Sequence, residues 1–170
     1  MKLVIHKYGG TSVGTPQRII NVAKRVKKWV DAGYCLLVVT SAMSGETNRL
    51  ISLVSEIIQG HNKWPREFDQ VVSTGEQVAA GLLTMALREV GISAISYSGW
   101  QIPILTDEIH SKARIKSIES KKLFEELSKR KVVVVTGFQG VNQAGEITTL
   151  GRGGSDTSAV ALSAALKAKE

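Results

Sequence analysis

The chain has 170 residues, of which 43% are hydrophobic and 22% charged, and its formal net charge is +7. This size and composition favour one globular domain with a sizeable core, and the single cysteine excludes a disulfide framework within the chain. No apolar run approaches the ~20 residues that cross a bilayer, and the first residues do not read as a signal peptide. We therefore expect a cytoplasmic protein with no membrane partner.

The positive charge is concentrated around residues 24–28 and residues 121–131. Both stretches fall on or beside a predicted helix, which favours a solvated helix face over a nucleic-acid surface. Aromatic residues make up only 5% of the chain, which leaves little to stack on bases. We expect no nucleic-acid partner, although the positive field would attract small anionic substrates.

Continuous apolar runs, typical of strands buried on both faces, alternate with segments whose apolar residues recur every three or four positions. Thr15 and Pro16 supply a cap and a first-turn proline, and Gly33 and Gly91 each end a helix. Strands are expected at Leu3–Lys7, Tyr34–Val39, Ser93–Tyr97, Val132–Val135 and Glu146–Thr149. Helices are expected at Thr15–Gly33, from about Leu50 to near Gly60, at Thr74–Val90 and Ser120–Arg130, and from about Asp156 onward; His61–Pro65 is expected to be a connector, and Gly99–Ser117 to hold short strands and loops.

This alternation of strands and helices predicts an α/β fold with a mainly parallel sheet. In such a sheet the loops that follow the strands lie at the carboxyl ends, where ligands bind. Polar, glycine-bearing loops are expected there at Lys7–Ser12, Ser41–Thr47, Gly137–Gly140 and Gly151–Ser158. Their convergence on one edge predicts a ligand site.

The last of these loops is a glycine-rich turn that leads into the final helix. Backbone N–H groups at a helix start have no partner inside the helix, so the place suits an anion. The Arg152 guanidinium group can bind a carboxylate or phosphate through two parallel hydrogen bonds. Gly153 and Gly154 allow a ligand to approach the backbone closely. The alternative is an ordinary helix cap, with Ser155 or Asp156 as the N-cap.

The first loop, after the first strand, has a similar character. Gly9 and Gly10 would let main-chain amides cup a phosphate, and Lys7 could reach the same phosphate as a point charge. Neither the Walker A pattern nor the dinucleotide fingerprint is present. The alternative for this loop is a tight turn with Lys7 in solvent. An acidic residue beside a phosphate site is explained if it orients a lysine, so Asp156 could have the role of orienting Lys7.

Three further polar residues have both a structural and a functional interpretation. Glu76 lies in a Thr74–Gln77 capping box and could complement the helix dipole, or it could accept a substrate ammonium group. Ser41 and Thr47 could bind a carboxylate or start a helix. The histidines, His6, His61 and His110, are scattered, so no metal site is expected.

The motifs together closely resemble the N-terminal part of aspartate kinases, in the amino-acid kinase family. Five matches occur in order over nearly the whole chain, at Lys7–Val13, Val39–Met43, Ser73–Gln77, Gly137–Gly140 and Thr148–Thr157. The resemblance implies a three-layer α/β/α, carbamate kinase-like fold. It also implies transfer of the ATP γ-phosphoryl group to the side-chain carboxylate of L-aspartate, the first step of lysine, threonine and methionine biosynthesis through diaminopimelate.

The resemblance also implies roles for individual residues. ATP phosphates would be held by Lys7, Tyr8, Gly9, Gly10 and Ser12, with Mg²⁺ carried on the phosphates and no protein metal ligand named. Lys7 would stabilise the transferred charge, and Asp156 would organise that lysine. Aspartate would be bound by Ser41, Thr47, Glu76, Phe138, Arg152, Gly153, Gly154 and Ser155, with Arg152 on a carboxylate and Glu76 facing the ammonium.

Members of this family are longer than 170 residues. Their adenine- and ribose-binding half and their regulatory domains have no counterpart here, so residues 1–170 are expected to be the substrate-side part of a truncated kinase domain, inactive alone. Family analogy also suggests a homodimer. Two alternatives remain open: a kinase for glutamate, acetylglutamate, carbamate or uridylate, and a non-catalytic basic binding module.

Overall fold

The core of the molecule is a parallel sheet. The computed structural model describes residues 2–60 and 63–170. The sheet has the order β1-β2-β6-β3, and each neighbouring pair is parallel. Its strands are β1 (Leu3–Tyr8), β2 (Cys35–Thr40), β6 (Val132–Thr136) and β3 (Ala94–Tyr97). Four of the five predicted strands and their parallel pairing are therefore confirmed, whereas the fifth, at Glu146–Thr149, belongs to another sheet, where it pairs antiparallel.

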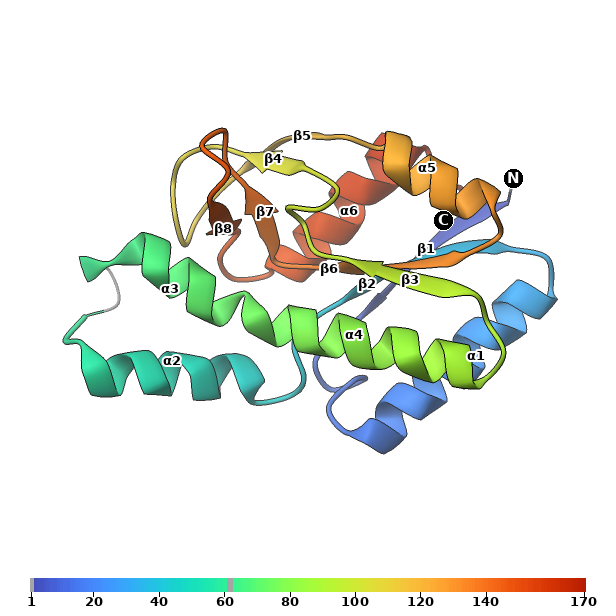
Figure 1. Ribbon diagram of the computed structural model, residues 1–170, viewed down its shortest axis with the longest axis horizontal. Helices are drawn as coiled ribbons and strands as arrows, with labels where there is room; N and C mark the ends of the chain where they lie inside the picture. The colour runs from blue at the N-terminus through green and yellow to red at the C-terminus, as the bar shows by residue number, and fades with distance from the viewer. Residues whose placement is uncertain (1, 61–62) are drawn as a thin grey trace.

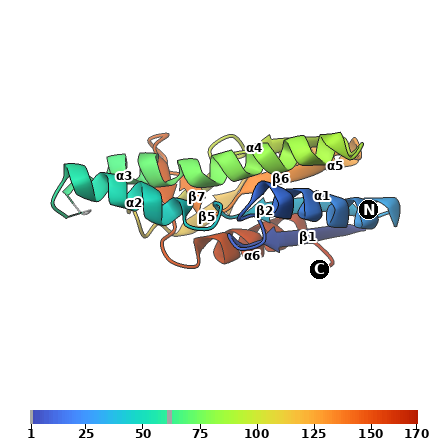
Figure 2. The same cartoon turned by 90° about the horizontal axis from the view of Figure 1, so that it is seen from below.

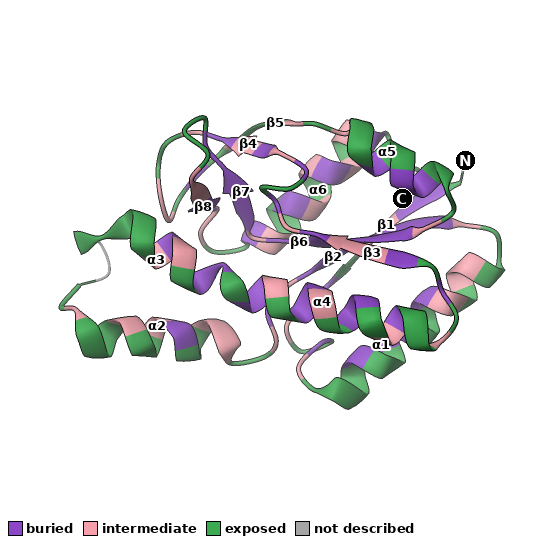
Figure 3. Cartoon of the chain, viewed as in Figure 1, coloured by how far each residue is buried: buried purple, intermediate pink, exposed green. Residues whose placement is uncertain are grey.

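Helices cover both faces of this sheet, because its strands present apolar side chains alternately to each side. Leu36 and Val38 of β2 pack in the core under α1 (Pro16–Asp31) and α4 (Thr74–Glu89). Leu37 and Val39 pack in the opposite core under α5 (Lys121–Ser128) and α6 (Gly154–Leu166). Figure 3 shows the resulting buried strands between helices with exposed outer faces. The three-layer α/β/α prediction is confirmed.

The helix ends follow the expected local chemistry in α1. Thr15 caps the helix by accepting a hydrogen bond from the backbone N–H of Arg18 at 3.3 Å, and Pro16 occupies the first turn. Gly33 and Gly91 follow the ends of α1 and α4 with φ of 87° and 82°, a conformation that glycine adopts without strain. No helix in residues 2–60 and 63–170 has the length and apolar character needed to cross a membrane.

Helix α3 (Pro65–Val72) was not predicted. It follows α2 (Glu46–Ile57), and Pro65 stands in its first turn. Ser73, between α3 and α4, is itself helical with φ −67° and ψ −18°, so the two helices form one nearly straight rod (Figure 1, Figure 2). The predicted capping box at Thr74 is therefore wrong: the Thr74 hydroxyl donates to the carbonyl of Val71 at 2.7 Å, as a residue inside a helical turn does.

The connector predicted at His61–Pro65 begins with His61 and Asn62, which lie outside the described residues. Pro65 itself belongs to α3.

A second, mixed sheet lies beyond the carboxyl end of β6. Its order is β5-β4-β7-β8, formed by β5 (Ile115–Ile118), β4 (Ile104–Thr106), β7 (Gln139–Val141) and β8 (Ile147–Thr149). Short strands were expected in the stretch that holds β4 and β5. Strand β7 was not predicted, because two glycines near its start resemble a loop. Gly140 is required there by close packing, since a Cβ on it would lie 2.5 Å from the carbonyl oxygen of Ile104.

Candidate active site

A cleft of about 280 Å³ lies at the carboxyl end of the parallel sheet. All four polar loops predicted to converge contribute to it, which confirms the convergence. Its wall residues come from the loop after β1, the β2–α2 loop and α2, the first turn of α4, the β6–β7 turn and the first turn of α6. Those among the predicted site residues are Gly10, Ser41, Thr47, Glu76, Phe138, Gly154 and Ser155.

Glycines allow these loops to pack against one another. A Cβ on Gly137 would lie 2.8 Å from the Cβ of Ser155, and a Cβ on Gly154 would lie 2.9 Å from the Phe138 ring. Both distances are shorter than real contacts allow, so a side chain at either position would push the β6–β7 turn away from α6. The start of α6 is thus held against the end of β6, where it forms one side of the cleft.

The first turn of α6 has no side-chain cap. Its N-cap is Gly153, with φ 75°, and Ser155 and Asp156 lie inside the helix, so the predicted capping role of these two residues is wrong. The first N–H groups of a helix lack intrahelical partners and carry a partial positive charge. In α6 the Gly154 and Asp156 N–H groups donate to the carbonyl oxygens of Gly151 and Gly153, so the Ser155 N–H and the partial positive charge of the helix end are what this turn offers an anion.

Lys7 and Asp156 meet next to the cleft, although neither is among its wall residues. The Lys7 Nζ lies 2.9 Å from the Asp156 Oδ1, joining β1 to the first turn of α6. Strand alternation directs Lys7 to the face that α6 covers. Gly9 lies beneath the ammonium group, since a Cβ on Gly9 would approach the Nζ to 3.3 Å. The structure therefore brings together three predicted residues, Lys7, Gly9 and Asp156.

Glu76 is the most unusual group in the cleft. Only 3% of the residue is exposed, yet its Oε1 accepts a hydrogen bond from the Ala42 N–H at 3.0 Å and its Oε2 has no partner among the described residues. Burial raises the pKa of the Glu76 carboxyl to about 7, against the opposing effect of the Ala42 hydrogen bond. An unpartnered buried carboxylate oxygen in a cleft is suited to a ligand that supplies a positive charge.

This buried carboxyl should make stability depend on pH. The folded-state pKa of about 7 lies above the ordinary 4.5, so the folded protein holds a proton that the unfolded chain loses. We expect the free energy of unfolding to fall as the pH rises between these values, by on the order of 3 kcal/mol in total. Urea denaturation at several pH values measures it.

A matched pair of variants isolates the contribution of Glu76. Glu76→Gln is neutral at every pH, so it should remove this part of the pH dependence, whereas Glu56→Gln at an exposed position of α2 should retain it. A Glu76→Gln profile that is parallel to the wild-type profile would contradict the assignment.

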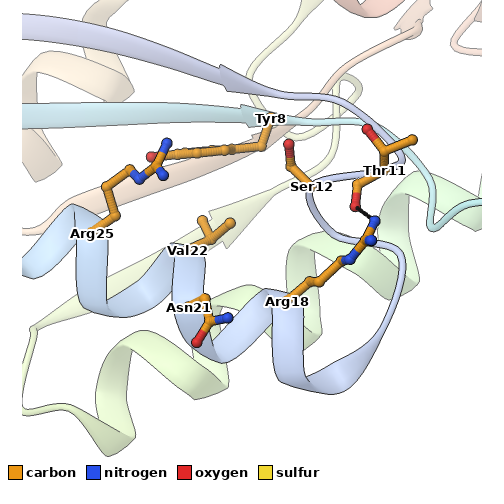
Figure 4. Close-up of a pocket in the computed structure, with 7 residues that line it drawn as sticks. All are labelled: Tyr8, Thr11, Ser12, Arg18, Asn21, Val22 and Arg25. Carbon is orange, nitrogen blue, oxygen red and sulfur yellow. Dashed lines mark hydrogen bonds between the residues drawn. The ribbon is translucent and has the colours of Figure 1, made fainter.

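Not every predicted site residue reaches this cleft. Arg152 and Gly153 are exposed just before the turn that lines it, and Arg152 makes no hydrogen bond or ion pair to any described residue. Tyr8 and Ser12 line a separate cavity against α1, which shares no residue with the cleft (Figure 4). Tyr8 follows Lys7 in β1 and therefore points to the opposite face of the sheet.

Asp69, on the unpredicted helix α3, was missed entirely. It is fully buried and accepts hydrogen bonds from His110, Ser111 and Thr149. These contacts tie α3 to β8 and to the segment before β5, next to the turn that carries Arg152. His110 thus has a structural role as a hydrogen-bond partner of Asp69. Asp69 stands between Phe68 and Gln70, close to Arg66 and Glu67, so the local sequence does not mark it as buried.

The described residues include no group of three or more His, Cys, Asp or Glu side chains arranged to hold a metal ion. Cys35, the single cysteine, is buried and free.

Known proteins resemble the chain over its whole length. It is 58% identical to an aspartate kinase of Pseudomonas fluorescens over 170 residues, and 51% identical to aspartokinase 2 of Bacillus subtilis over 168 residues. These alignments cover 100% and 99% of this chain but 41% of each relative, so the chain spans about two fifths of the length of these relatives.

Solved structures give the same result. The aspartate kinase of Synechocystis is 48% identical, with a TM-score of 0.81 over 99% of this chain and 27% of that one. Aspartokinase III of Escherichia coli, in complex with aspartate and ADP, is 26% identical, with a TM-score of 0.83 over 99% of this chain and 48% of that one. The model of the amino acid kinase family matches residues 2–170. With this match and the three-layer fold, the chain belongs to the amino acid kinase family.

Proposed function

We propose that the chain is the substrate-side part of an aspartate kinase, which transfers the γ-phosphoryl group of ATP to the side-chain carboxylate of L-aspartate. The observation that carries the proposal is the buried Glu76 carboxyl, whose Oε2 lacks a partner in a cleft bordered by the Lys7–Asp156 pair. A substrate that has an ammonium group and carboxylates complements these charges. Support comes from relatives named aspartate kinase and from a structural neighbour whose complex holds aspartate and ADP.

The cleft residues, together with Arg152 and Gly153 on the adjoining exposed turn, account for aspartate recognition in this proposal. Glu76 faces the substrate ammonium, and the pairing offsets the cost of the buried charge. Arg152 binds a substrate carboxylate with its planar fork, together with the Ser155 hydroxyl. The remaining contacts come from the side chains of Ser41, Thr47 and Phe138 and from the backbone at Gly153 and Gly154.

The nucleotide would lie on the Lys7 side of the cleft. The Lys7 ammonium, the glycine backbone at Gly9 and Gly10, and the Ser155 N–H at the start of α6 fit the phosphates of ATP, since each offers positive charge, close approach to the backbone or an N–H donor. Tyr8 and Ser12 contribute to this loop through their backbone, because their side chains line the other cavity. Mg²⁺ bound to the phosphates would neutralise part of their charge.

Catalysis in this arrangement needs no general base, since the attacking carboxylate is already ionised. The residues bring two anions together and stabilise the charge that moves between them. Lys7 neutralises the transferred phosphoryl charge, and Asp156 fixes the position of the Lys7 ammonium. In this proposal the whole kinase also contains the part that binds adenine and ribose, and it forms a homodimer. It acts in the cytoplasm, in lysine, threonine and methionine biosynthesis.

A joined enzyme tests the proposal. Residues 1–170 are fused to the remaining part of the Pseudomonas fluorescens relative, which they match over 41% of its length. Aspartyl phosphate trapped as the hydroxamate identifies the product with aspartate, and ADP release measures activity with glutamate, acetylglutamate, carbamate and uridylate as alternative acceptors. We expect product with aspartate alone and almost none from residues 1–170 by themselves. A folded joined enzyme that phosphorylates another acceptor, or none, would refute the proposal.

Arg152 should affect aspartate binding more than turnover. Arg152→Gln removes a charged two-pronged contact worth roughly 1.5–3 kcal/mol, so we expect the KM for aspartate in the joined enzyme to rise about tenfold to a hundredfold. Arg152→Lys keeps the positive charge but loses the planar guanidinium group. Its KM for aspartate should therefore lie between the values for the wild type and for Arg152→Gln. Arg130→Gln, on the loop after α5, serves as the control. An unchanged KM for aspartate in Arg152→Gln would remove Arg152 from the site.

A further inference from the structure

A second cavity, of about 310 Å³, lies between α1 and the loop after β1 (Figure 4). Arg18, Asn21 and Arg25 line it from α1, because residues three, four and seven apart share one face of a helix. Thr11 and Ser12 line it from the loop, and the Tyr8 ring, 7% exposed, lines it from the sheet. This volume lies at the lower end of the range for small-molecule sites.

The cavity carries positive charge that no described residue neutralises. Arg18 donates one hydrogen bond to the Thr11 carbonyl oxygen at 2.6 Å, and neither Arg18 nor Arg25 forms an ion pair with any residue in 2–60 or 63–170. The arginines of α2 and α3 differ, since Arg49 and Arg66 both pair with glutamates. The acid of α1, Asp31, is occupied by Lys27 at 3.0 Å.

The other polar groups of the cavity are suited to an anion as well. The hydroxyls of Thr11 and Ser12 and the amide NH₂ of Asn21 can donate hydrogen bonds, and the Tyr8 hydroxyl, 3.4 Å from the His6 Nδ1, can donate to a ligand when that nitrogen carries the imidazole hydrogen. Arg25 extends toward Tyr8 and Arg18 toward Thr11, so the guanidinium groups lie toward opposite ends of the cavity (Figure 4). Seven residues of helix separate them by about 10 Å along the axis. A ligand that contacts both must therefore carry an anionic or polar group at each end.

We propose that this cavity binds a small, elongated metabolite with two anionic groups, one of them a phosphoryl group bound between Arg25 and the Tyr8 hydroxyl. The second anionic group contacts Arg18 at the Thr11 end. A phosphoryl group fits the Arg25 end because its three terminal oxygens can accept from a guanidinium fork and from hydroxyls at once. This site is separate from the cleft of the proposed kinase reaction and does not depend on that reaction.

The cavity nevertheless shares its loop with the Lys7 side of the cleft. The Ser12 N–H donates to the Gly9 carbonyl oxygen at 2.9 Å, closing a turn whose one end lies against the Lys7 ammonium and whose other end lines the cavity. A ligand that ties Thr11 and Ser12 to α1 would therefore hold this turn in one conformation.

Calorimetric titration of the 170-residue chain tests the site. The probes are 3-phosphoglycerate, which has a phosphoryl and a carboxylate group, inorganic phosphate, and succinate as a dicarboxylate. We expect saturable binding of 3-phosphoglycerate, about tenfold tighter than of phosphate or succinate, the difference being about 1.4 kcal/mol. Backbone amide NMR shifts should change at residues 8–12 and along α1. No saturable binding of 3-phosphoglycerate, or succinate binding equally well, would overturn the proposal.

Matched variants locate the bound anion. Arg18→Gln with Arg25→Gln should weaken 3-phosphoglycerate binding about tenfold or more. Arg25→Gln alone keeps the Arg18–Thr11 contact and should still weaken it. Lys24→Gln with Lys28→Gln removes the same charge from exposed positions of α1 and should change the affinity less than about twofold. Equal loss in the two double variants would indicate general attraction to a basic helix, and loss in Lys7→Ala instead would place the anion in the kinase cleft; either result refutes the site.

Discussion

Asp69→Ala is expected to destabilise the protein by about 4 kcal/mol, the largest stability change anticipated for a single side chain in this fold. Asp69 has no exposed surface. Its Oδ2 accepts from the His110 Nδ1 at 2.9 Å and from the backbone N–H groups of Ser111 and Thr149, each at 3.0 Å. Its Oδ1 accepts from the Thr149 hydroxyl at 2.6 Å. Removing the carboxylate leaves several donors without an acceptor in the interior.

Asp69→Asn separates the charge from the hydrogen bonds. The amide oxygen can still accept from the backbone N–H groups, and the amide NH₂ can donate to the hydroxyl oxygens of Ser111 and Thr149. We expect a smaller loss, about 1–2 kcal/mol. Asp31→Ala is the control, because its ion pair with Lys27 is solvent-exposed and worth about 0–1 kcal/mol.

Urea denaturation of the three variants measures these changes in the free energy of unfolding. The expected order of destabilisation is Asp69→Ala, then Asp69→Asn, then Asp31→Ala. Equal midpoints for Asp69→Ala and Asp31→Ala would show that the buried hydrogen bonds contribute nothing net.

The same contacts connect α3 to the proposed substrate site. Thr149 ends β8, and two residues later Gly151, with φ 78°, packs against Ser111, whose carbonyl oxygen would lie 3.2 Å from a Cβ there. Asp69 contacts both Thr149 and Ser111, so it fixes the base of the turn that carries Arg152. In the joined enzyme, Asp69→Asn should therefore raise the KM for aspartate more than it lowers turnover.

The parallel sheet could be predicted because its evidence is local. A run such as Val132–Val135 has one explanation, a strand buried on both faces, and Thr15-Pro16 starts a helix by its own chemistry. The convergence of the loops then follows from the topology of parallel strands rather than from any single residue. For this reason the cleft lined by Gly10, Ser41 and Ser155 could be predicted from the sequence.

Helix α3 and the Asp69 contacts could not be predicted, because their evidence is non-local. Thr74 and Gln77 satisfy a capping pattern, but packing extends the helix through Ser73 and the pattern is not used. The partners of Asp69 lie 41 to 80 residues away in sequence, and nothing in the local sequence indicates them. Strand β7 has the same difficulty, since its Gly140 is required by Ile104 in another strand.

Lys7→Ala in the joined enzyme is expected to lower turnover by a factor of about 10²–10³ while changing stability by less than about 1 kcal/mol. The Lys7 side chain is 29% exposed and that of Asp156 is 71% exposed, so their pair at 2.9 Å lies largely in solvent. Such a pair contributes little to folding. Removing the Lys7 ammonium group should therefore lower the turnover. In the reaction this group would contact the charge of the phosphoryl group inside a closed site.

Lys27→Ala is a closely matched control, since Lys27 also pairs with an aspartate, at 3.0 Å, and is 42% exposed. Equal stability losses with unequal turnover would separate a catalytic lysine from one that merely forms a surface pair. Asp156→Asn distinguishes the charge of Lys7 from its position. This variant keeps the Lys7 ammonium group but no longer holds it in one place, so turnover should fall less than in Lys7→Ala. If Asp156→Asn proves more severe than Lys7→Ala, Asp156 contributes to the reaction directly, because the loss of a positioning partner alone cannot exceed the loss of the group it positions.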